Sequence, residues 1–320
     1  MELINNPTHD QIKKAAKALH DGRLVAFPTE TVYGLGADAT NEKAVSRIYS
    51  VKGRPTDHPL IVHISSINQL DKWAVAIPDY AFNLANEFWP GPMTLIFKRS
   101  DLAKDFITGG QENVGLRVPA HPKALTLLKK FEDLGGKGIA APSANRFGAV
   151  SPTTAEAVCE ELGLYFDSGD LILNGGQSSI GIESTIIDCT GSVPKILRLG
   201  AITGEMVVST SGLNLENRNS PAIIRAPGLM KSHYSPDALV VIDEIALPGE
   251  GQIALAKFDT SPGAIRLASP KNNIEFANQL YSALRYADKI GLKIIKIKLP
   301  EIDGIGAAIQ DRIKKSSFKL

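Results

Sequence analysis

Short apolar segments typical of strands alternate with amphipathic segments typical of helices through the first two hundred residues. Thr8 and Gln11 have the spacing of a helix capping box, and the apolar run 24–27 resembles a buried strand that ends at Pro28, because proline has no N–H to donate. This alternation predicts an α/β fold with a sizeable twisted, mixed sheet, and it argues against a helical bundle or an all-β sandwich. Further strands are expected at 60–64, 94–97, 114–118, 138–141, 184–188 and 196–199, and helices from residue 41 and over 153–162.

Residues 204–237 break this rhythm, because they contain many turn-forming residues and little apolar periodicity. We expect them to form a linker without regular structure, and a linker of this length in a compact chain favours a function such as a lid. The alternating pattern then returns and predicts a smaller, Rossmann-like α/β domain over 238–320. Its strands are expected at 239–242, 253–258, 265–268 and 293–299, and its helices over 273–290 and 305–315.

Composition narrows the classes of function. The chain has 320 residues, a formal net charge of +1 and 22% charged residues, so its overall charge does not predict a nucleic acid or a membrane surface as partner. Cys159 and Cys189 lie far apart and lack the spacing of zinc ligands. The sequence shows no signal-peptide pattern and no apolar run of membrane-spanning length, so we expect a reduced, cytoplasmic location.

The segment 28–36, Pro-Thr-Glu-Thr-Val-Tyr-Gly-Leu-Gly, places small hydroxyls and glycines directly after an apolar strand. Thr29 and Thr31 can bond a polar ligand, while Gly34 and Gly36 permit close backbone approach and a positive φ. Together they predict a ligand-binding turn at this strand end.

Two cations follow at the end of the next helix-like run, in Lys52-Gly53-Arg54-Pro55. Arginine offers a rigid donor fork that matches phosphate, and lysine offers a mobile point charge. Such residues are usually solvated surface charges, but the flanking Gly53 and Pro55 stiffen this turn and favour a functional role. The two segments together indicate a cleft that binds an anion and an amine.

Two further strands carry a polar residue in an apolar setting. For His63 the simpler interpretation is a packed, hydrogen-bonded histidine. Arg117 requires an anionic partner if its side of the strand is buried. Glu30 and Asp188 are the candidate partners within the chain, and a ligand carboxylate is the functional alternative.

Ser143 and Asn145 follow the apolar run 138–141, at a strand end where open α/β sheets bind ligands. Ser151 precedes the next helix and is either its N-cap or a site residue. No Ser–His–Asp or Cys–His arrangement can be argued from the spacing, so covalent catalysis is not indicated. Gly304-x-Gly306 lacks the third glycine and the βα unit of a dinucleotide site, and we interpret it as a structural turn.

These segments together resemble the YrdC family, and within it the long two-domain threonylcarbamoyl-AMP synthases. The resemblance spans nearly the whole chain, and its motifs occur in the expected order. They are Pro28 to Gly36, Lys52-Gly-Arg-Pro55, Pro59-Leu-Ile-Val-His63, Gly91-Pro-Met-Thr94, Leu116-Arg-Val-Pro119, Ala141-Pro-Ser-Ala-Asn145, Ser151-Pro-Thr153, Glu183-Ser-Thr185, Leu197-Arg-Leu-Gly200, Pro227-Gly228, His233-Tyr-Ser-Pro236, Leu284-Arg285 and Ala308-Ile-Gln-Asp-Arg312.

The resemblance implies a YrdC-like catalytic domain with a concave cleft over 1–203, a linker or lid over 204–237 and the small domain over 238–320. It implies that L-threonine, bicarbonate and ATP react to give threonylcarbamoyl-AMP, pyrophosphate and water. A carbamate of threonine would attack the α-phosphorus, which requires positioning and charge stabilisation rather than a protein nucleophile. Mg²⁺ is expected to accompany ATP, without a tightly bound cofactor. The expected partners are proteins that transfer the product to tRNA, with a weak contact to tRNA itself and none to a membrane.

The resemblance also assigns residues by position. Arg117 would bind the threonine carboxylate, and Asn113 and Ala141 would contribute backbone groups. Threonine would be held by Thr31, His63, Arg117, Ala141 and Ser184. ATP would be held by Arg54, His58, Asn113, Ser143, Asn145, Ser151, Arg198 and Tyr234. Lys52, Arg54 and Ser143 would form the catalytic group, in which Lys52 adds positive charge near the phosphates.

The chain departs from the family pattern in two places. His58 stands where the family often has asparagine, which we expect to tune the nucleotide contact, and Lys231-Ser232 precede His233-Tyr234 where many relatives carry an aromatic and a basic residue. Two other classes stay open. One is a double-stranded RNA-binding module without catalysis, against which the near-neutral charge of residues 1–200 counts. The other is a carbamoyl-transfer enzyme of the hydrogenase-maturation kind, whose acylphosphatase-like and zinc-finger segments have no counterpart in this sequence.

Overall fold

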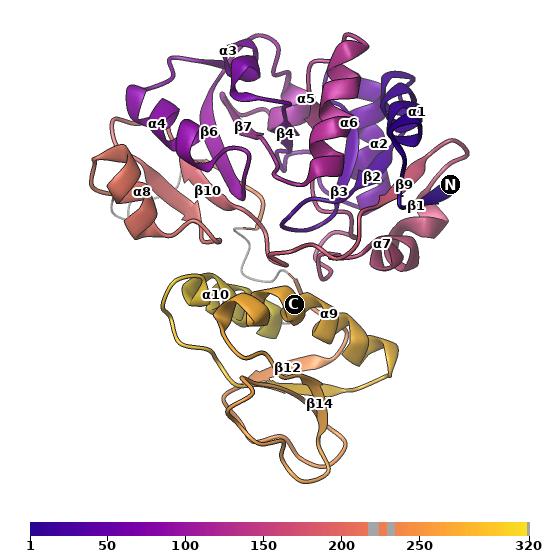
Figure 1. Cartoon of the computed structure of the whole chain (residues 1–320), viewed down its shortest axis with the longest axis vertical. Helices are drawn as coiled ribbons and strands as arrows, with labels where there is room; N and C mark the ends of the chain where they lie inside the picture. Colours follow the sequence, from indigo (N-terminus) through magenta and orange to yellow (C-terminus); the bar gives the residue numbers. More distant parts are fainter. Residues whose placement is uncertain (217–223, 229–233, 319–320) are drawn as a thin grey trace.

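Two α/β units make up the molecule (Figure 1). The computed structural model describes residues 1–216, 224–228 and 234–318. Among these residues the larger unit has an eleven-stranded mixed sheet and the smaller a four-stranded parallel sheet, which confirms the predicted fold class. Within the same residues no helix has the length and apolar character needed to cross a membrane.

Both faces of the larger sheet are covered, because alternate residues of one strand enter different apolar clusters. Val25 and Phe27 pack into one cluster and Ala26 into another, as the two-residue repeat of a strand requires. The strands are β1 (Glu2–Asn5), β2 (Val25–Phe27), β3 (Gly34–Asp38), β4 (Ile61–His63), β5 (Ala74–Val75), β6 (Met93–Arg99), β7 (Asn113–Arg117), β8 (Ile139–Ala140), β9 (Leu171–Asn174), β10 (Thr185–Asp188) and β11 (Lys195–Arg198).

The hydrogen-bonded order of this sheet is β1-β9-β2-β3-β8-β4-β7-β6-β10-β11, with β5 beside β6. Strands β4 and β7 are parallel, and their register pairs His63 with Arg117. Because paired residues on neighbouring strands project to the same face, these two side chains lie next to each other. The topology thus brings together two residues that the sequence predicts for one site.

Local signals explain where the helices of the larger unit begin and end. Thr8 and Gln11 form the predicted capping box at the first helix, and Asn41 caps the second, which ends at Gly53 with a left-handed φ of 60°. The helices are α1 (His9–His20), α2 (Glu42–Lys52), α3 (Leu70–Trp73), α4 (Asp79–Phe88), α5 (Asp105–Thr108), α6 (Pro122–Asp133), α7 (Ala155–Leu162) and α8 (Gly204–Ser211), with 3₁₀ turns at Ile67–Gln69 and Gly163–Tyr165.

The smaller unit presents its two helices to the larger one, while its sheet lies beyond them (Figure 1). Its elements are β12 (Leu239–Ile242), β13 (Gly251–Ile253), β14 (Ile265–Ala268), α9 (Asn273–Lys289), β15 (Ile294–Ile297) and α10 (Gly306–Ser317). The strand order is β12-β15-β13-β14, with every pair parallel.

Residues from outside the smaller unit complete its apolar core. Val32, Val150, Ile182 and Tyr234 belong to the same buried cluster as Phe276 and the other core residues of α9 and α10. The two units therefore share a packed boundary.

Three expectations about local structure were wrong. Strand β13 ends at Ile253 rather than continuing to 258, because the chain turns there and Phe258 N–H donates to the Leu255 carbonyl. Gly34 and Gly36 both lie in β3 without a positive φ, although the predicted close approach is present at Gly36, since a Cβ there would lie 2.8 Å from the Ile139 side chain. The range 204–237 begins with helix α8, which Thr203 caps and Gly212 ends. The proposed domain boundaries themselves stay predictions.

Candidate active site

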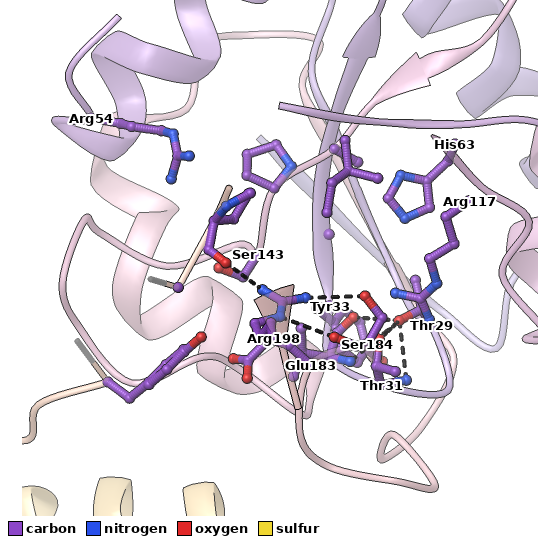
Figure 2. A pocket seen from close by; sticks show the side chains of 18 residues that line it. Thr29, Thr31, Tyr33, Arg54, His63, Arg117, Ser143, Glu183, Ser184 and Arg198 are labelled. Atoms are coloured by element: carbon purple, nitrogen blue, oxygen red, sulfur yellow. Dashed lines mark hydrogen bonds between the residues drawn. The ribbon is translucent and has the colours of Figure 1, made fainter. Parts of the chain in front are cut away.

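Polar side chains from several strand ends meet in one cleft of the larger unit (Figure 2). Residues 29–34 follow β2, His63 and Arg117 end β4 and β7, and Ser184 directly precedes β10. Such convergence at strand ends is where open α/β sheets bind ligands. The predicted residues that line the cleft are Thr31, Arg54, His63, Arg117, Ala141, Ser143, Ser184, Arg198 and Tyr234.

The turn after β2 is held by its own hydroxyl groups. Thr29 Oγ1 donates to the Val32 carbonyl at 2.7 Å and lies 2.8 Å from Thr31 Oγ1. The N–H groups of Ile180 and Gly181 donate to carbonyls of the same turn. These bonds fix the backbone of the turn, so Thr31 presents its hydroxyl from a well-defined position.

Arg117 is buried and paired with Glu30, one of its two predicted partners. Its Nη2 donates to Glu30 Oε1 at 2.6 Å and its Nε to the Gly91 carbonyl at 3.2 Å. The other predicted partner, Asp188, instead accepts from Thr190. A guanidinium has five N–H donors, so Arg117 retains donors for a ligand carboxylate at this wall of the cleft.

His63 lies beside Arg117, with its ring edge-on to Phe27 at a centroid distance of 6.0 Å. Burial and the neighbouring Arg117 lower the pKa of His63 to about 3, so the imidazole is neutral near pH 7. Its Nδ1 is buried and has no hydrogen-bond partner among the described residues. Buried polar atoms are nearly always paired, so a ligand hydrogen bond is a better explanation of His63 than packing alone.

Ser143 sits on a loop that is held from behind by Lys52. Ser143 forms a β-bridge with Gly34, and Lys52 Nζ donates to the carbonyls of Ser143 at 2.6 Å and Asn145 at 2.5 Å. Burial lowers the pKa of Lys52 well below its ordinary value. Lys52 is not in the cleft lining and supports the loop that carries Ser143, so the expectation that it adds positive charge near the phosphates stays a prediction.

Arg54 and Arg117 lie at opposite sides of the cleft, with Arg198 between them (Figure 2). Arg54 Nη2 donates to the Pro59 carbonyl at 2.9 Å, and its guanidinium lies 5.7 Å from the centroid of the Phe147 ring. Burial lowers the pKa of Arg54 to about 10, which leaves it charged at neutral pH. The cleft therefore has one arginine at each end, of which Arg117 is already paired with Glu30.

Arg198 ties the centre of the cleft together. Its Nη2 donates to Ser184 Oγ and its Nε to the Ser184 carbonyl, both at 3.0 Å, and its Nη1 donates to the Pro227 carbonyl at 3.1 Å. Ser184 Oγ also lies 2.8 Å from Thr94 Oγ1. The arginine thus connects β10, β11 and the described linker residues 224–228.

Four predicted ATP-site residues lie outside the cleft lining. His58 packs edge-on against Phe147 with ring centroids 5.2 Å apart. Asn113 lies in a neighbouring hollow that linker residues 224–227 also line. The Asn145 amide donates to the carbonyls of residues 146 and 149.

Ser151, the fourth of these residues, donates to Glu183 at 2.6 Å. It is not the N-cap of α7, because Thr154 takes that position. The N–H of Ala141 already donates to the Ile61 carbonyl. The predicted backbone contact of Ala141 with a ligand would therefore use its carbonyl group. Lys231, Ser232 and His233 lie outside the described residues.

Sequence reasoning gave Glu183 no role, although the structure places it in the cleft wall. Its carboxylate accepts from Ser151, Tyr281 and Arg312, and the last two belong to the smaller unit. The sequence feature that could have indicated a role for Glu183 is its position directly before Ser184, a predicted site residue. Its partners lie so far along the chain that no local pattern identifies them.

The donor set of the cleft does not fit a resident metal ion. Within the described residues, no group of three or more His, Cys, Asp or Glu side chains is placed to hold one. Glu30 and Glu183, which could supply carboxylate oxygens, are each paired with an arginine. The expectation of Mg²⁺ therefore concerns an ion that arrives with ATP.

Comparisons with known proteins agree with this arrangement. Residues 17–200 match the sequence family Sua5_yciO_yrdC, described as "Telomere recombination", and residues 199–317 match the family "Threonylcarbamoyl-AMP synthase, C-terminal domain". The chain is 40% identical to the threonylcarbamoyl-AMP synthase of Pyrococcus abyssi, over 96% of this chain and 94% of that protein. It is 37% identical to the Bacillus subtilis protein of the same name, over 96% and 93%.

The crystal structure of P. abyssi Sua5 complexed with L-threonine superposes with a TM-score of 0.88 at 37% identity, and the match covers 99% of this chain and 98% of that one. Both domains are matched by these relatives. The chain therefore belongs to the family of long, two-domain threonylcarbamoyl-AMP synthases.

Proposed function

We propose that this chain forms threonylcarbamoyl-AMP from L-threonine, bicarbonate and ATP, with release of pyrophosphate and water. The names of the full-length relatives and the L-threonine in the P. abyssi structure support the proposal. The observation that carries it is the cleft itself, in which Arg117 and the neutral His63 at one end face Arg54 at the other. This arrangement suits an amino acid and a nucleotide bound end to end.

At the amino-acid end, Arg117 binds the threonine carboxylate through the donors that Glu30 and Gly91 leave available. The uncharged His63 and the hydroxyl of Thr31 offer hydrogen bonds without adding charge. The threonine ammonium first gives up a proton and becomes a nucleophilic amine, while bicarbonate takes up a proton and loses water to give CO₂. The amine then attacks CO₂ and releases a second proton to solvent, and a carbamate results. Holding the amine and CO₂ together replaces a bimolecular encounter with an oriented one.

At the nucleotide end, the carbamate oxygen attacks the α-phosphorus of ATP, and the bond to the β-phosphate oxygen breaks so that pyrophosphate leaves. Arg54, Arg198 and the Ser143 hydroxyl surround this position and stabilise the negative charge that develops on the phosphate oxygens. Mg²⁺ would accompany ATP as part of the substrate and would add to this charge stabilisation.

The product is an activated acyl adenylate, and the proposal includes its use by separate proteins that transfer the threonylcarbamoyl group to tRNA in the cytoplasm. Direct binding of double-stranded RNA is the alternative function. It would be recognised as a salt-sensitive RNA affinity without turnover of ATP.

The test is to incubate the full chain with L-threonine, bicarbonate and ATP and to measure pyrophosphate and the adenylate directly. We expect both products, and we expect neither when threonine or bicarbonate is omitted. Pyrophosphate release that does not depend on threonine would contradict the proposal, as would RNA binding by a chain that forms no adenylate.

A further inference from the structure

One contact of the smaller unit with the cleft wall is made through a buried carboxylate. Glu183 Oε2 accepts from Arg312 Nε at 2.8 Å and from the Tyr281 hydroxyl at 3.0 Å, while its Oε1 accepts from Ser151 Oγ at 2.6 Å. Tyr281 lies on α9 and Arg312 on α10. Burial would raise the pKa of Glu183, but Arg312, Arg198 and Ser151 outweigh it and lower the pKa to about 2. The carboxylate is therefore charged when it accepts these bonds.

Arg312 contacts both chain segments that meet at the centre of the cleft. Its side chain is 0% exposed, its Nη2 donates to the Leu199 carbonyl at 2.8 Å, and its guanidinium lies 5.2 Å from the centroid of the Tyr234 ring. Leu199 directly follows Arg198, and Glu183 directly precedes Ser184. One arginine of the smaller unit thus holds the neighbours of both residues that meet at the centre of the cleft.

Stability alone does not explain this cluster. Removing two charges from water is so costly that replacing a buried ion pair with apolar residues of similar size is often neutral or stabilising. An apolar pair could not form directional hydrogen bonds. Glu183 accepts one from Ser151, and Arg312 donates one to the carbonyl of residue 199. Geometry is therefore the property that this pair contributes.

We infer that Arg312 and Tyr281 are positioning residues for the cleft of the larger unit: by holding Glu183, they keep Ser184 and Arg198 in the arrangement that meets the substrates. The inference rests on the proposed function and assigns the smaller unit a part in it. The smaller unit completes the wall of the active site from outside, through hydrogen bonds rather than through a substrate contact.

The experiment compares full-length variants by thermal unfolding and by steady-state formation of the adenylate. Arg312→Met leaves Glu183 buried without its cation, and we expect kcat to fall on the order of 100-fold, the effect of a displacement of about 1 Å at a reacting group. Arg312→Lys, which keeps the charge but not the fork, should recover part of that loss. The double variant Glu183→Met/Arg312→Met removes both charges. Its unfolding temperature should therefore recover relative to Arg312→Met, while its kcat should stay as low as that of Arg312→Met.

The matched control is Asn278→Ala. Asn278 also bonds across the boundary, from Nδ2 to the Ser178 and Ser179 carbonyls, without touching Glu183. We expect wild-type kcat in this variant. Full activity in Arg312→Met or in the double variant would overturn the inference, as would an equal loss in Asn278→Ala. A wild-type chain that makes no adenylate would overturn the proposed function and this inference with it.

Discussion

Arg117 and Glu30 form a buried ion pair, so the amino-acid end of the cleft carries no large excess of charge before a ligand arrives. A zwitterionic amino acid suits such a wall, because its carboxylate can take directed hydrogen bonds from the arginine while its amine stays near neutral groups. His63 fits the same logic, since its imidazole is uncharged and one of its nitrogens is unsatisfied. The charge states of these residues therefore distinguish the amino-acid end of the cleft from the nucleotide end.

Arg117→Ala should weaken threonine binding by about 2–4 kcal/mol, the usual effect of removing one partner of a desolvated charge pair. ATP binding should be spared, because Arg54 lies at the far side of the cleft. Isothermal titration calorimetry with each ligand measures both effects. The variant also leaves Glu30 unpaired, so Arg117→Ala combined with Glu30→Gln serves as the folding control. Unchanged threonine affinity in both variants would contradict the assignment.

Arg54→Ala should have the opposite profile, with ATP binding weakened more than threonine binding, because Arg54 lies among the predicted nucleotide contacts. Its structural bonds to the 58 and 59 carbonyls are modest. The same titrations in parallel provide the measurement. If Arg54→Ala and Arg117→Ala gave the same profile, the division of the cleft into two ends would be wrong.

His63 should make folding stability depend on pH. Its pKa of about 3 in the folded chain lies below the ordinary 6.5, so the unfolded chain gains a proton that the folded chain excludes. The contribution of the neutral His63 to the free energy of unfolding is fully present above pH 6.5. It is lost at a slope approaching 1.4 kcal/mol per pH unit as the pH falls toward 3. Urea unfolding of the wild type and His63→Gln at pH 7 and pH 5 tests it. A difference in stability between the two chains that stayed constant with pH would refute it.

At the scale of elements, the sequence predicts what depends on local contacts. The capping box at Thr8 and the helix that Asn41 begins were confirmed because their hydrogen bonds join residues three apart. Strand β13 was predicted too long, because an apolar run cannot reveal that the chain turns after Ile253. Lys52 was expected to add positive charge near the phosphates, and no sequence pattern shows to which side the last residue of a helix points.

The position of Lys52 leads to a prediction about α2. A lysine that projected its charge into the cleft would be dispensable for folding, whereas one that donates to two loop carbonyls would not be. Lys52→Met should therefore destabilise the ligand-free chain by about 1–3 kcal/mol, because it leaves buried carbonyls unpaired. Urea unfolding measures this, with Lys43→Met on the exposed side of α2 as control. If ligand-free Lys52→Met were as stable as the wild type, the result would favour a role for Lys52 as a phosphate-binding cation instead.

At the scale of the whole molecule, the two α/β units could be predicted from their alternating patterns, but their joint could not. Glu183 and Arg312 meet although they lie in different units, and Val32 and Ile182 enter the core of the smaller unit. Neither polar partners nor apolar contacts at such separations leave a mark on local sequence. The composition of the cleft wall is thus a property of the assembled chain.

Tyr234 lies at this joint, and its role as part of a lid stays a prediction. Its buried ring stacks on Tyr281 with centroids 5.7 Å apart, and the residue lines the cleft. It also adopts a left-handed φ of 64°, a conformation that surrounding contacts must support. The stacking supports an anchor for the smaller unit, and the place in the cleft lining supports a contact with the nucleotide.

Two substitutions separate these roles. Tyr234→Phe retains the stacked ring and removes only the hydroxyl, whereas Tyr234→Ala removes both. If the tyrosine closes over the nucleotide, both variants should weaken ATP binding, by about 0.5–1.5 kcal/mol for the lost hydrogen bond alone, and Tyr234→Phe should unfold like the wild type. Binding of threonine and ATP together should also slow tryptic cleavage after the exposed Arg225 in the wild type. An anchor predicts the reverse: wild-type ATP affinity in Tyr234→Phe, lost stability only in Tyr234→Ala, and equal cleavage with and without both ligands.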